Sequence, residues 1–237
     1  MINKQPIEKR EPSYEGTLQV HSIFKTIQGE GPFCGTPCVF VRLAGCNLQC
    51  PACDTDYTSK RQSMTPAEIC MAVTDLQGKL FPMLVVITGG EPFRQHIGEL
   101  VDKLVARGHY VQIESNGTMN PPVFPWNKDT SQRRGAYIVI SPKTGKINTL
   151  AEAAACALKY VVAWDKVGKD GLPSSALDMP NAPARPTPGL FDGQIYIQPL
   201  DSKDPEENKL HTDVAVMLSL EHGYILQLQV HKYIGVE

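Results

Sequence analysis

The sequence lacks an excess of charge of either sign. Its 237 residues include 23 lysines and arginines and 25 aspartates and glutamates, so the formal net charge is −2. Proteins that bind nucleic acid or an anionic membrane surface usually carry a clear basic excess. The balanced charge therefore predicts neither nucleic acid nor a membrane as the main partner.

Long hydrophobic runs are also missing. The longest apolar stretches, such as residues 83–88, have the length of a strand and fall far short of the roughly 20 residues that a membrane helix needs. Residues 1–16 are polar and contain proline, unlike the apolar centre of a signal peptide. With 42% hydrophobic and 20% charged residues, the composition is typical of a soluble globular protein. We expect one cytoplasmic domain over residues 1–237, with residues 1–16 as an N-terminal extension.

The cysteine content does not suit a secreted protein with disulfide bonds. There are seven cysteines, an odd number, and five of them lie within the twenty residues 34–53. In a reducing compartment, the usual reasons for such a group are metal binding or redox chemistry.

Strand and helix signals alternate along most of the chain. Short runs rich in β-branched and aromatic residues predict buried strands, and the capping box that joins Thr65 to Glu68 predicts the start of a helix. Residues 17–24 predict an additional edge strand or hairpin. The predicted strands are 38–44, 84–88, 110–115, 136–141, 159–164, 195–200 and 224–233, and the predicted helices are 65–77, 97–105, 150–157 and 204–222.

Repeated strand-then-helix units favour a parallel sheet. Because no glycine-rich dinucleotide turn follows the first strand, we favour an α/β fold of the open, partial (β/α)6 barrel type, with a flat doubly wound sheet as the alternative. Chemistry belongs at the C-terminal ends of the strands in either fold. Residues 165–193, with five prolines and four glycines, predict an irregular insertion that acts as a lid, a dimer contact or a disordered loop.

The strongest chemical motif is CNLQCPAC, residues 46–53, with the spacing C-x₃-C-x₂-C. A structural zinc site uses four ligands, usually as two pairs, so a zinc site here would need a fourth ligand from Cys34, Cys38 or His21. Three thiolates on a tight loop suit a [4Fe-4S] cluster in which one iron has no protein ligand. That open iron can bind a small-molecule chelate.

The triplet, together with TGGEP at residues 88–92, resembles the radical S-adenosylmethionine (SAM) superfamily. Residues 24–55, FKTIQGEGPFCGTPCVFVRLAGCNLQCPACDT, more narrowly resemble the 7-carboxy-7-deazaguanine synthase family (QueE) through QGEG, FVRL, GCNL and CDT. The segments SPK and QPLD and the ending LQVHKYIGVE also match. The resemblance covers nearly the whole chain and leaves residues 1–16 and 165–193 unmatched.

The resemblance implies a lyase with a barrel of the radical SAM type. A reduced cluster passes an electron to SAM, and the resulting 5′-deoxyadenosyl radical abstracts hydrogen from 6-carboxy-5,6,7,8-tetrahydropterin. The ring contracts and ammonia is lost, which gives 7-carboxy-7-deazaguanine, an intermediate toward queuosine and related 7-deazapurines. SAM is regenerated and Mg²⁺ assists. A homodimer and an electron donor such as flavodoxin or ferredoxin are also implied.

The resemblance further implies roles for individual residues. The cluster ligands are Cys46, Cys50 and Cys53, and Thr55 binds Mg²⁺ through its hydroxyl. SAM is expected to contact Ala52, Cys53, Asp54, Gly90, Glu91, Ser141, Pro142, Lys143, Gln198, Pro199, Leu200 and Asp201. The pterin is expected to contact Ile27, Gln28, Gly29, Arg42, Thr88 and the terminal Glu237.

Some of these roles also have a physical basis in the residues. Arg42 suits a bidentate grip on the substrate carboxylate, although an arginine in an apolar strand can instead pair with an internal carboxylate such as Glu30 or Glu114. Gly90 lets the backbone approach a ligand, and Glu91 offers a carboxylate to the SAM ammonium group.

Two other functions compete with this interpretation. Another radical SAM enzyme, such as a glycyl-radical activase, would share the triplet and GGEP but would not need QGEG or CDT. A non-enzymatic zinc-binding domain would not need GGEP. Cys70 and Cys156 lie in helical patterns and are predicted to be small core residues.

Overall fold

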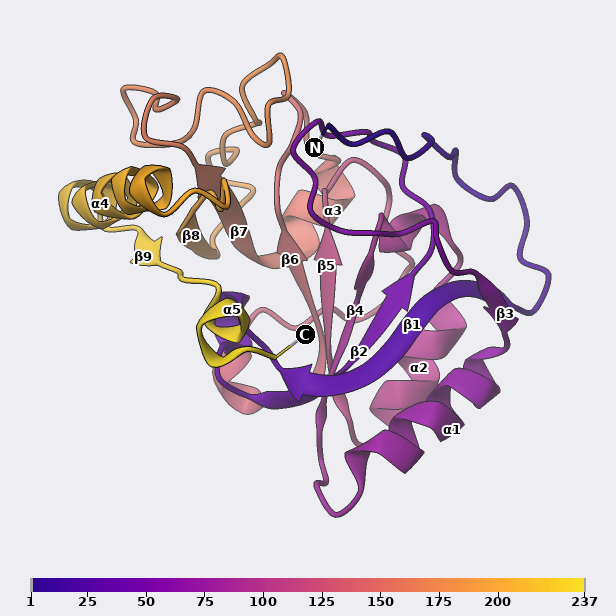
Figure 1. The fold of residues 1–237 in the computed structure, drawn as a ribbon. Helices are drawn as coiled ribbons and strands as arrows, with labels where there is room; N and C mark the ends of the chain where they lie inside the picture. The colour runs from indigo at the N-terminus through magenta and orange to yellow at the C-terminus, as the bar shows by residue number, and fades with distance from the viewer. Residues whose placement is uncertain (1, 237) are drawn as a thin grey trace.

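The computed structural model describes residues 2–236, which form one open sheet of nine strands in the order β3-β1-β2-β4-β5-β6-β7-β8-β9 (Figure 1). All neighbouring pairs from β2 to β9 are parallel, whereas β1 pairs antiparallel with both β2 and β3. The open parallel sheet confirms the predicted partial barrel. The strands are β1 Leu18–Ile27, β2 Pro37–Leu43, β3 Gln62–Met64, β4 Leu84–Gly89, β5 Tyr110–Ser115, β6 Gly135–Ile140, β7 Ala155–Val162, β8 Gln194–Pro199 and β9 Ile225–Leu226.

Helices connect most of the parallel strands, whereas segments without an α-helix join β5 to β6 and β7 to β8. Helix α1 begins after Thr65, whose hydroxyl accepts a hydrogen bond from the Glu68 N–H while the Glu68 carboxylate accepts one from the Thr65 N–H, so the predicted capping box is confirmed. Helices α1 and α2 lie side by side against the sheet (Figure 1). The helices are α1 Pro66–Gln77, α2 Gly98–Ala106, α3 Thr149–Ala154, α4 Pro205–His222 and α5 Val230–Ile234. None of the helices in residues 2–236 combines the length and the apolar character needed to span a membrane.

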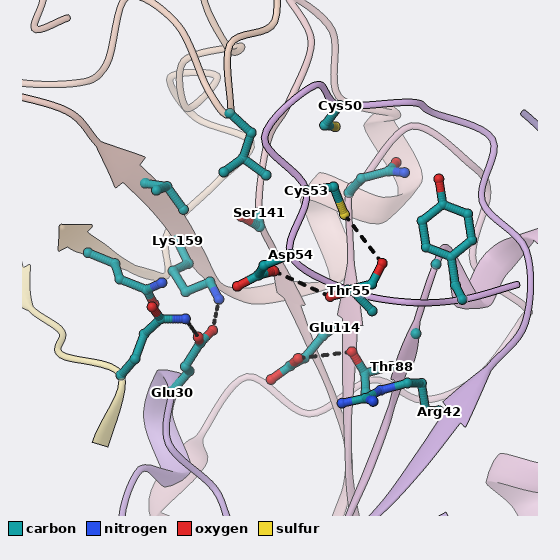
Figure 2. Close-up of a pocket in the computed structure, with 18 of the residues that line it drawn as sticks. Glu30, Arg42, Cys50, Cys53, Asp54, Thr55, Thr88, Glu114, Ser141 and Lys159 are labelled. Atoms are coloured by element: carbon teal, nitrogen blue, oxygen red, sulfur yellow. Dashed lines mark hydrogen bonds and ion pairs between the residues drawn. The ribbon is translucent and has the colours of Figure 1, made fainter. Parts of the chain in front are cut away.

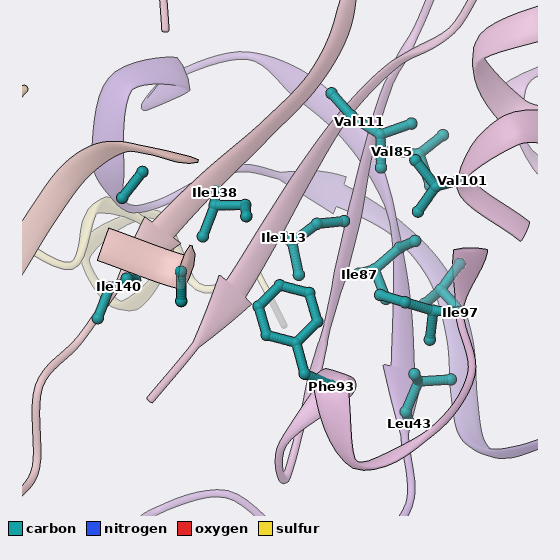
Figure 3. Packing of buried hydrophobic residues seen from close by; sticks show 14 of the residues in the cluster. Leu43, Val85, Ile87, Phe93, Ile97, Val101, Val111, Ile113, Ile138 and Ile140 are labelled. Atoms are coloured by element: carbon teal, nitrogen blue, oxygen red, sulfur yellow. The ribbon is translucent and has the colours of Figure 1, made fainter. Parts of the chain in front are cut away.

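The central strands are buried on both faces, as their continuous apolar runs predict. Val85 and Ile87 of β4 face the helices and pack with Val101 of α2 and with Phe93 (Figure 3). The other face forms a second cluster around Phe33, whose ring meets the Tyr137 ring edge-on at 4.9 Å. This second cluster fills the inside of the partial barrel near the beginnings of the strands.

Side chains on the inner face change from apolar to polar along each strand. In β5, Tyr110 belongs to the inner cluster, and the residues two and four positions later on the same face are Gln112 and Glu114. β2 and β4 likewise end near Arg42 and Thr88. The open, C-terminal end of the barrel is therefore polar.

The structure corrects the predicted boundary between α3 and β7. The predicted helix 150–157 ends at Ala154, and β7 begins at Ala155, so Cys156 lies in a buried strand and not in a helix. Alanine-rich sequence fits both conformations, and pairing with β6 and β8 decides between them.

The predicted final strand, 224–233, is also wrong. Only Ile225 and Leu226 pair with β8, and the chain then turns into α5. The cause is Gln227, which is buried and whose side-chain amide donates to the Gly29 carbonyl and accepts from the Gly31 N–H. These bonds draw the chain across the open end of the barrel.

Candidate active site

A cavity of about 450 Å³ opens at the C-terminal end of the barrel strands. Figure 2 shows the cysteine loop on one side of it and the ends of β2, β4 and β5 on the other. The structure brings most of the predicted site residues together around this cavity. Those that line it are Ile27, Gln28, Arg42, Cys46, Cys50, Ala52, Cys53, Asp54, Thr55, Thr88, Gly90, Ser141, Lys143, Gln198, Leu200 and Asp201.

The three cysteines of the triplet lie along one wall. Cys46 and Cys50 are buried, and Cys53 is half-buried. Burial raises the pKa of the Cys46 thiol to about 12, whereas at Cys50 the positive charge of Lys143 opposes the rise in pKa that burial causes. Such thiols become thiolates when a metal binds them, because the metal charge replaces the lost solvation. The donors are therefore all soft sulfur, which suits iron.

A single metal ion fits these residues poorly. Within residues 2–236, no three His, Cys, Asp or Glu side chains gather around one ion position, as a structural zinc site would require. In a cubane cluster each thiolate binds a different iron, so the three sulfur atoms need not meet at one point. The triplet fits a [4Fe-4S] cluster for this reason.

Gly89, the last residue of β4, packs against the end of β2, and Gly90 packs against the cysteine loop. A Cβ atom on Gly90 would lie 2.0 Å from the Gly45 oxygen and 2.8 Å from the Cys46 Cβ. Gly89 has φ +127°, and a Cβ there would lie 2.1 Å from the Leu43 oxygen. Both glycines are thus required by the close approach of two backbones, in addition to any approach of a ligand.

Glu91 is not among the residues that line the cavity, and its predicted contact with SAM stays a prediction. It is fully buried, and its carboxylate accepts hydrogen bonds from the Ser115 hydroxyl at 2.8 Å, the Asn116 N–H at 2.7 Å and the Phe93 N–H at 3.0 Å. Burial raises the pKa of Glu91, and these bonds oppose that rise. Glu91 therefore joins the end of β4 to the end of β5.

Four other predicted contacts also lie outside the cavity lining or the described chain. Gly29, Pro142 and Pro199 adjoin lining residues without lining the cavity themselves. A Cβ on Gly29 would lie 2.0 Å from Nδ1 of His231. Helix α5 can therefore pack against residue 29 only because glycine has no side chain there. Glu237 lies outside the described residues.

The opposite end of the cavity carries one cation, Arg42, and one half-buried carboxylate, Glu114. The Arg42 guanidinium carbon lies 5.1 Å from the centre of the Phe24 ring, a cation–π distance. Glu114 accepts hydrogen bonds from Gln28 at 2.9 Å, from Gln112 at 2.9 Å and from Thr88 at 3.1 Å. Figure 2 shows the bond from Thr88. Burial raises the pKa of Glu114, while these bonds and the charge of Arg42 lower it.

The sequence analysis missed a second charged pair in the cavity wall. Lys159 of β7 forms an ion pair with Glu30, and Gln229 donates to the other Glu30 oxygen at 2.8 Å (Figure 2). Glu30 therefore pairs with Lys159, which removes one of the two internal partners considered for Arg42. A lysine on the inner face of an otherwise apolar strand was the available sequence signal.

The 165–193 insertion contributes to the cavity wall beside the cysteine loop. Leu177 lines the cavity, and its carbonyl accepts a hydrogen bond from the Ala52 N–H at 3.2 Å. The Tyr160 hydroxyl donates to the Ala184 carbonyl at 2.7 Å, which ties the insertion to β7. Whether the insertion acts as a lid or as a dimer contact stays a prediction.

Comparisons with known proteins agree with the geometry. The model of the radical SAM superfamily matches residues 41–133. The chain is 38% identical over 247 residues to the 7-carboxy-7-deazaguanine synthase of Rhodospirillum rubrum, with 100% of both chains covered. It is also 38% identical over 238 residues to that of Rickettsia prowazekii, covering 95% of this chain and 92% of the relative. The crystal structure of QueE from Escherichia coli shares the fold, with a TM-score of 0.66 at 22% identity over 90% of this chain and 94% of that one.

Proposed function

The chain belongs to the family of 7-carboxy-7-deazaguanine synthases, and we propose that the cavity of Figure 2 is its active site. The activity is that of a radical SAM lyase, which converts 6-carboxy-5,6,7,8-tetrahydropterin to 7-carboxy-7-deazaguanine with loss of ammonia in 7-deazapurine biosynthesis. Neither a glycyl-radical activase nor a zinc-binding domain is supported, since the full-length relatives are synthases. The assignment of the active site to this cavity rests on one observation: the cysteine triplet lines the same cavity as Arg42 and Glu114.

The cysteine wall suits the cluster and its cofactor. When bound, the [4Fe-4S] cluster and SAM supply the one-electron chemistry that starts the reaction. Cys46, Cys50 and Cys53 would hold the cluster, and the half-buried ammonium of Lys143 would offset their negative charge. Lys143 is fixed by donating to the Ser141 carbonyl at 3.1 Å and to its hydroxyl.

The opposite end of the cavity suits a carboxylated pterin. The Arg42 guanidinium, fixed against Phe24, binds the substrate carboxylate. Glu114 is held by three donors and presents negative charge to the N–H groups of the pterin edge. One positive and one negative group at this end match a substrate that carries both a carboxylate and a guanidine-like edge.

The residues between these two ends suit Mg²⁺. Thr55 provides a hydroxyl, and the carboxylates of Asp54 and Asp56 also line the cavity. Mg²⁺ prefers oxygen donors and usually keeps several water molecules, so one or two protein oxygens together with the substrate carboxylate are sufficient. We assign Thr55 as the Mg²⁺ ligand on this basis.

The remaining parts of the proposal follow from family membership. An electron donor such as flavodoxin or ferredoxin reduces the cluster, the protein works as a homodimer, and it acts in the cytoplasm. These three statements rest on the family alone.

The function is tested by anaerobic reconstitution. We expect brown protein with four irons per chain that converts the carboxylated pterin to 7-carboxy-7-deazaguanine in the presence of SAM, Mg²⁺ and a reductant. Zinc in place of iron, or cleavage of SAM without any turnover of the pterin, would contradict the assignment.

A further inference from the structure

The cysteine loop has few hydrogen bonds of its own. Residues 44–61, the cysteine loop, contain no strand or helix, so they have no regular ladder of backbone hydrogen bonds. Within the loop, the Cys53 N–H donates to the Cys50 carbonyl and the Gly45 N–H donates to the Tyr57 carbonyl. Cys46 is the one residue of this loop that forms a β-bridge, and its partner in the bridge is Ile7. Ile7 belongs to residues 1–16, the segment predicted to be an N-terminal extension. The extension therefore has a structural relation to the cluster site.

Gln5 makes the most specific contact between the extension and the loop. Its side-chain Nε2 donates to the Thr55 carbonyl at 2.9 Å, and its Oε1 accepts from the Tyr57 N–H at 2.8 Å and the Thr58 hydroxyl at 3.0 Å. A single amide side chain thus bonds the loop as a neighbouring strand would. Thr55, the proposed Mg²⁺ ligand, lies two residues after Cys53 and is held at its carbonyl.

Neighbouring residues of the extension contact the other part of the loop. The Asn3 N–H donates to the Pro51 carbonyl at 2.9 Å, and the Asn3 side chain donates to the Cys50 carbonyl at 3.1 Å. The Glu8 N–H donates to the Cys46 carbonyl at 2.7 Å. The extension therefore contacts the loop backbone at or near all three cysteines.

The extension is also anchored by Arg94, which is not part of the loop. Arg94, which follows the GGEP motif, is buried and donates to the Lys9 carbonyl at 3.1 Å and to the Glu11 carboxylate at 3.3 Å. It also donates to the Ala44 carbonyl at 3.2 Å, at the start of the loop. Because this anchor lies outside the loop, the extension can restrain the loop rather than only follow it.

We propose that Gln5 is a positioning residue for the cluster. Its amide holds the arm of the loop that carries Cys53 and Thr55 in the conformation that binds iron, before the cluster is present. The proposal rests on the proposed function in one respect, the assignment of this loop to a [4Fe-4S] cluster.

The main test compares the full-length variants Gln5→Ala and Gln5→Glu with wild type and with Lys4→Ala, an exposed neighbour that serves as the control. Reconstituted protein, without SAM or pterin, is mixed anaerobically with a ferrous chelator, and the half-time of iron release is measured. We expect release about tenfold faster in both Gln5 variants, which corresponds to about 1.4 kcal/mol, and unchanged release in Lys4→Ala. In Gln5→Glu, faster release is expected because a carboxylate oxygen replaces the donor Nε2 and repels the Thr55 carbonyl oxygen.

A second measurement does not require the cluster. In the apoprotein, hydrogen exchange at the Tyr57 amide should be accelerated in Gln5→Ala but remain slow in Gln5→Glu, which keeps the acceptor. Equal iron release in wild type and both variants would overturn the proposal. So would faster release that parallels a fall in apoprotein Tm, because Gln5 would then be a general stabiliser. If wild type itself binds no cluster, the proposed function fails, and the Tyr57 exchange still decides whether Gln5 holds the loop.

Discussion

The three cysteines of the triplet are predicted to bind three different irons, so they cannot replace one another. Cys46→Ala, Cys50→Ala or Cys53→Ala should abolish the brown colour and SAM cleavage. Iron analysis and an absorbance spectrum of the anaerobic protein provide the measurement. Cys70→Ala and Cys156→Ala are the controls, since both thiols are buried in the core away from the cavity. A Cys46→Ala protein that keeps four irons and cleaves SAM would refute the ligand assignment.

Arg42 is predicted to provide most of the discrimination for a carboxylated substrate. Removing one partner of a buried ion pair typically costs about 3–5 kcal/mol, so Arg42→Ala should weaken pterin binding roughly 10²- to 10³-fold. Arg42→Lys should recover only part of the loss, because an ammonium cannot make the forked contact. Titration with the carboxylated pterin and its decarboxylated analogue, in the presence of SAM, measures this effect.

Two outcomes would count against that role. Wild-type protein that binds the two pterins equally would show that the carboxylate is not recognised. Loss of iron in Arg42→Ala would show a structural role, since Arg42 lies in β2 and precedes the cysteine loop.

Thr55 is predicted to make the rate depend on Mg²⁺. After treatment with a chelator, wild type should lose most of its activity and regain it with Mg²⁺, because a hard cation stabilises charge that develops near the substrate carboxylate. Thr55→Ala should need more Mg²⁺ for half-maximal rate. The control is Thr74→Ala, which removes a hydroxyl from α1, away from the cavity. Equal rates with and without Mg²⁺ in wild type would rule out this role for Thr55.

At the scale of elements, α5 closes the cavity through one lysine. Lys232 of α5 donates to Asp201, after β8, at 2.6 Å and lies 3.5 Å from Asp54 of the cysteine loop. This hydrogen bond, with others from Asn208 and the Lys203 N–H, lowers the pKa of Asp201 to about 2. One side chain thus joins the C-terminal helix to two walls of the cavity.

The lowered pKa predicts a pH dependence. A carboxyl whose pKa is depressed in the folded state stabilises the fold above its unfolded value, and this stabilisation is lost as the pH falls through the folded value. For Asp201 the loss spans pH 3.8 down to about 2. Urea unfolding of the apoprotein should therefore show a smaller drop in stability over this range for Lys232→Ala than for wild type. Identical drops would show that the pair contributes nothing to stability.

At the scale of the whole molecule, the core does not depend on the cluster. The two buried clusters pack on the two faces of the sheet and do not include the three cysteines that are predicted to bind the cluster. A variant with Cys46, Cys50 and Cys53 all replaced by Ala should still unfold cooperatively, with Tm lowered by less than about 10 °C. Thermal unfolding followed by circular dichroism tests this, with the wild-type apoprotein as reference. A variant without a cooperative transition would mean that the loop is part of the folding core.

The position of the site could be predicted because it depends on local pattern. Strand periodicity and the capping box at Thr65 placed most elements, and special residues after successive strands indicated the C-terminal edge of the sheet. The elements placed wrongly, residues 150–157 and 224–233, have sequences that suit two conformations. Their structures were decided by the available strand partners and by Gln227.

The sequence by itself determined the chemistry of this protein, because the spacing of Cys46, Cys50 and Cys53 and the residues beside them are local features of one loop. Only the tertiary structure decided which polar side chains serve that chemistry. The Lys159–Glu30 pair joins residues 129 positions apart, and Gln5 meets Thr55 across 50 positions. The tertiary structure also places Glu91 outside the cavity lining, where its carboxylate accepts hydrogen bonds from Ser115 of β5 and from Asn116, the next residue. A buried polar group must find its partner wherever the fold brings one, and sequence spacing carries no information about that distance.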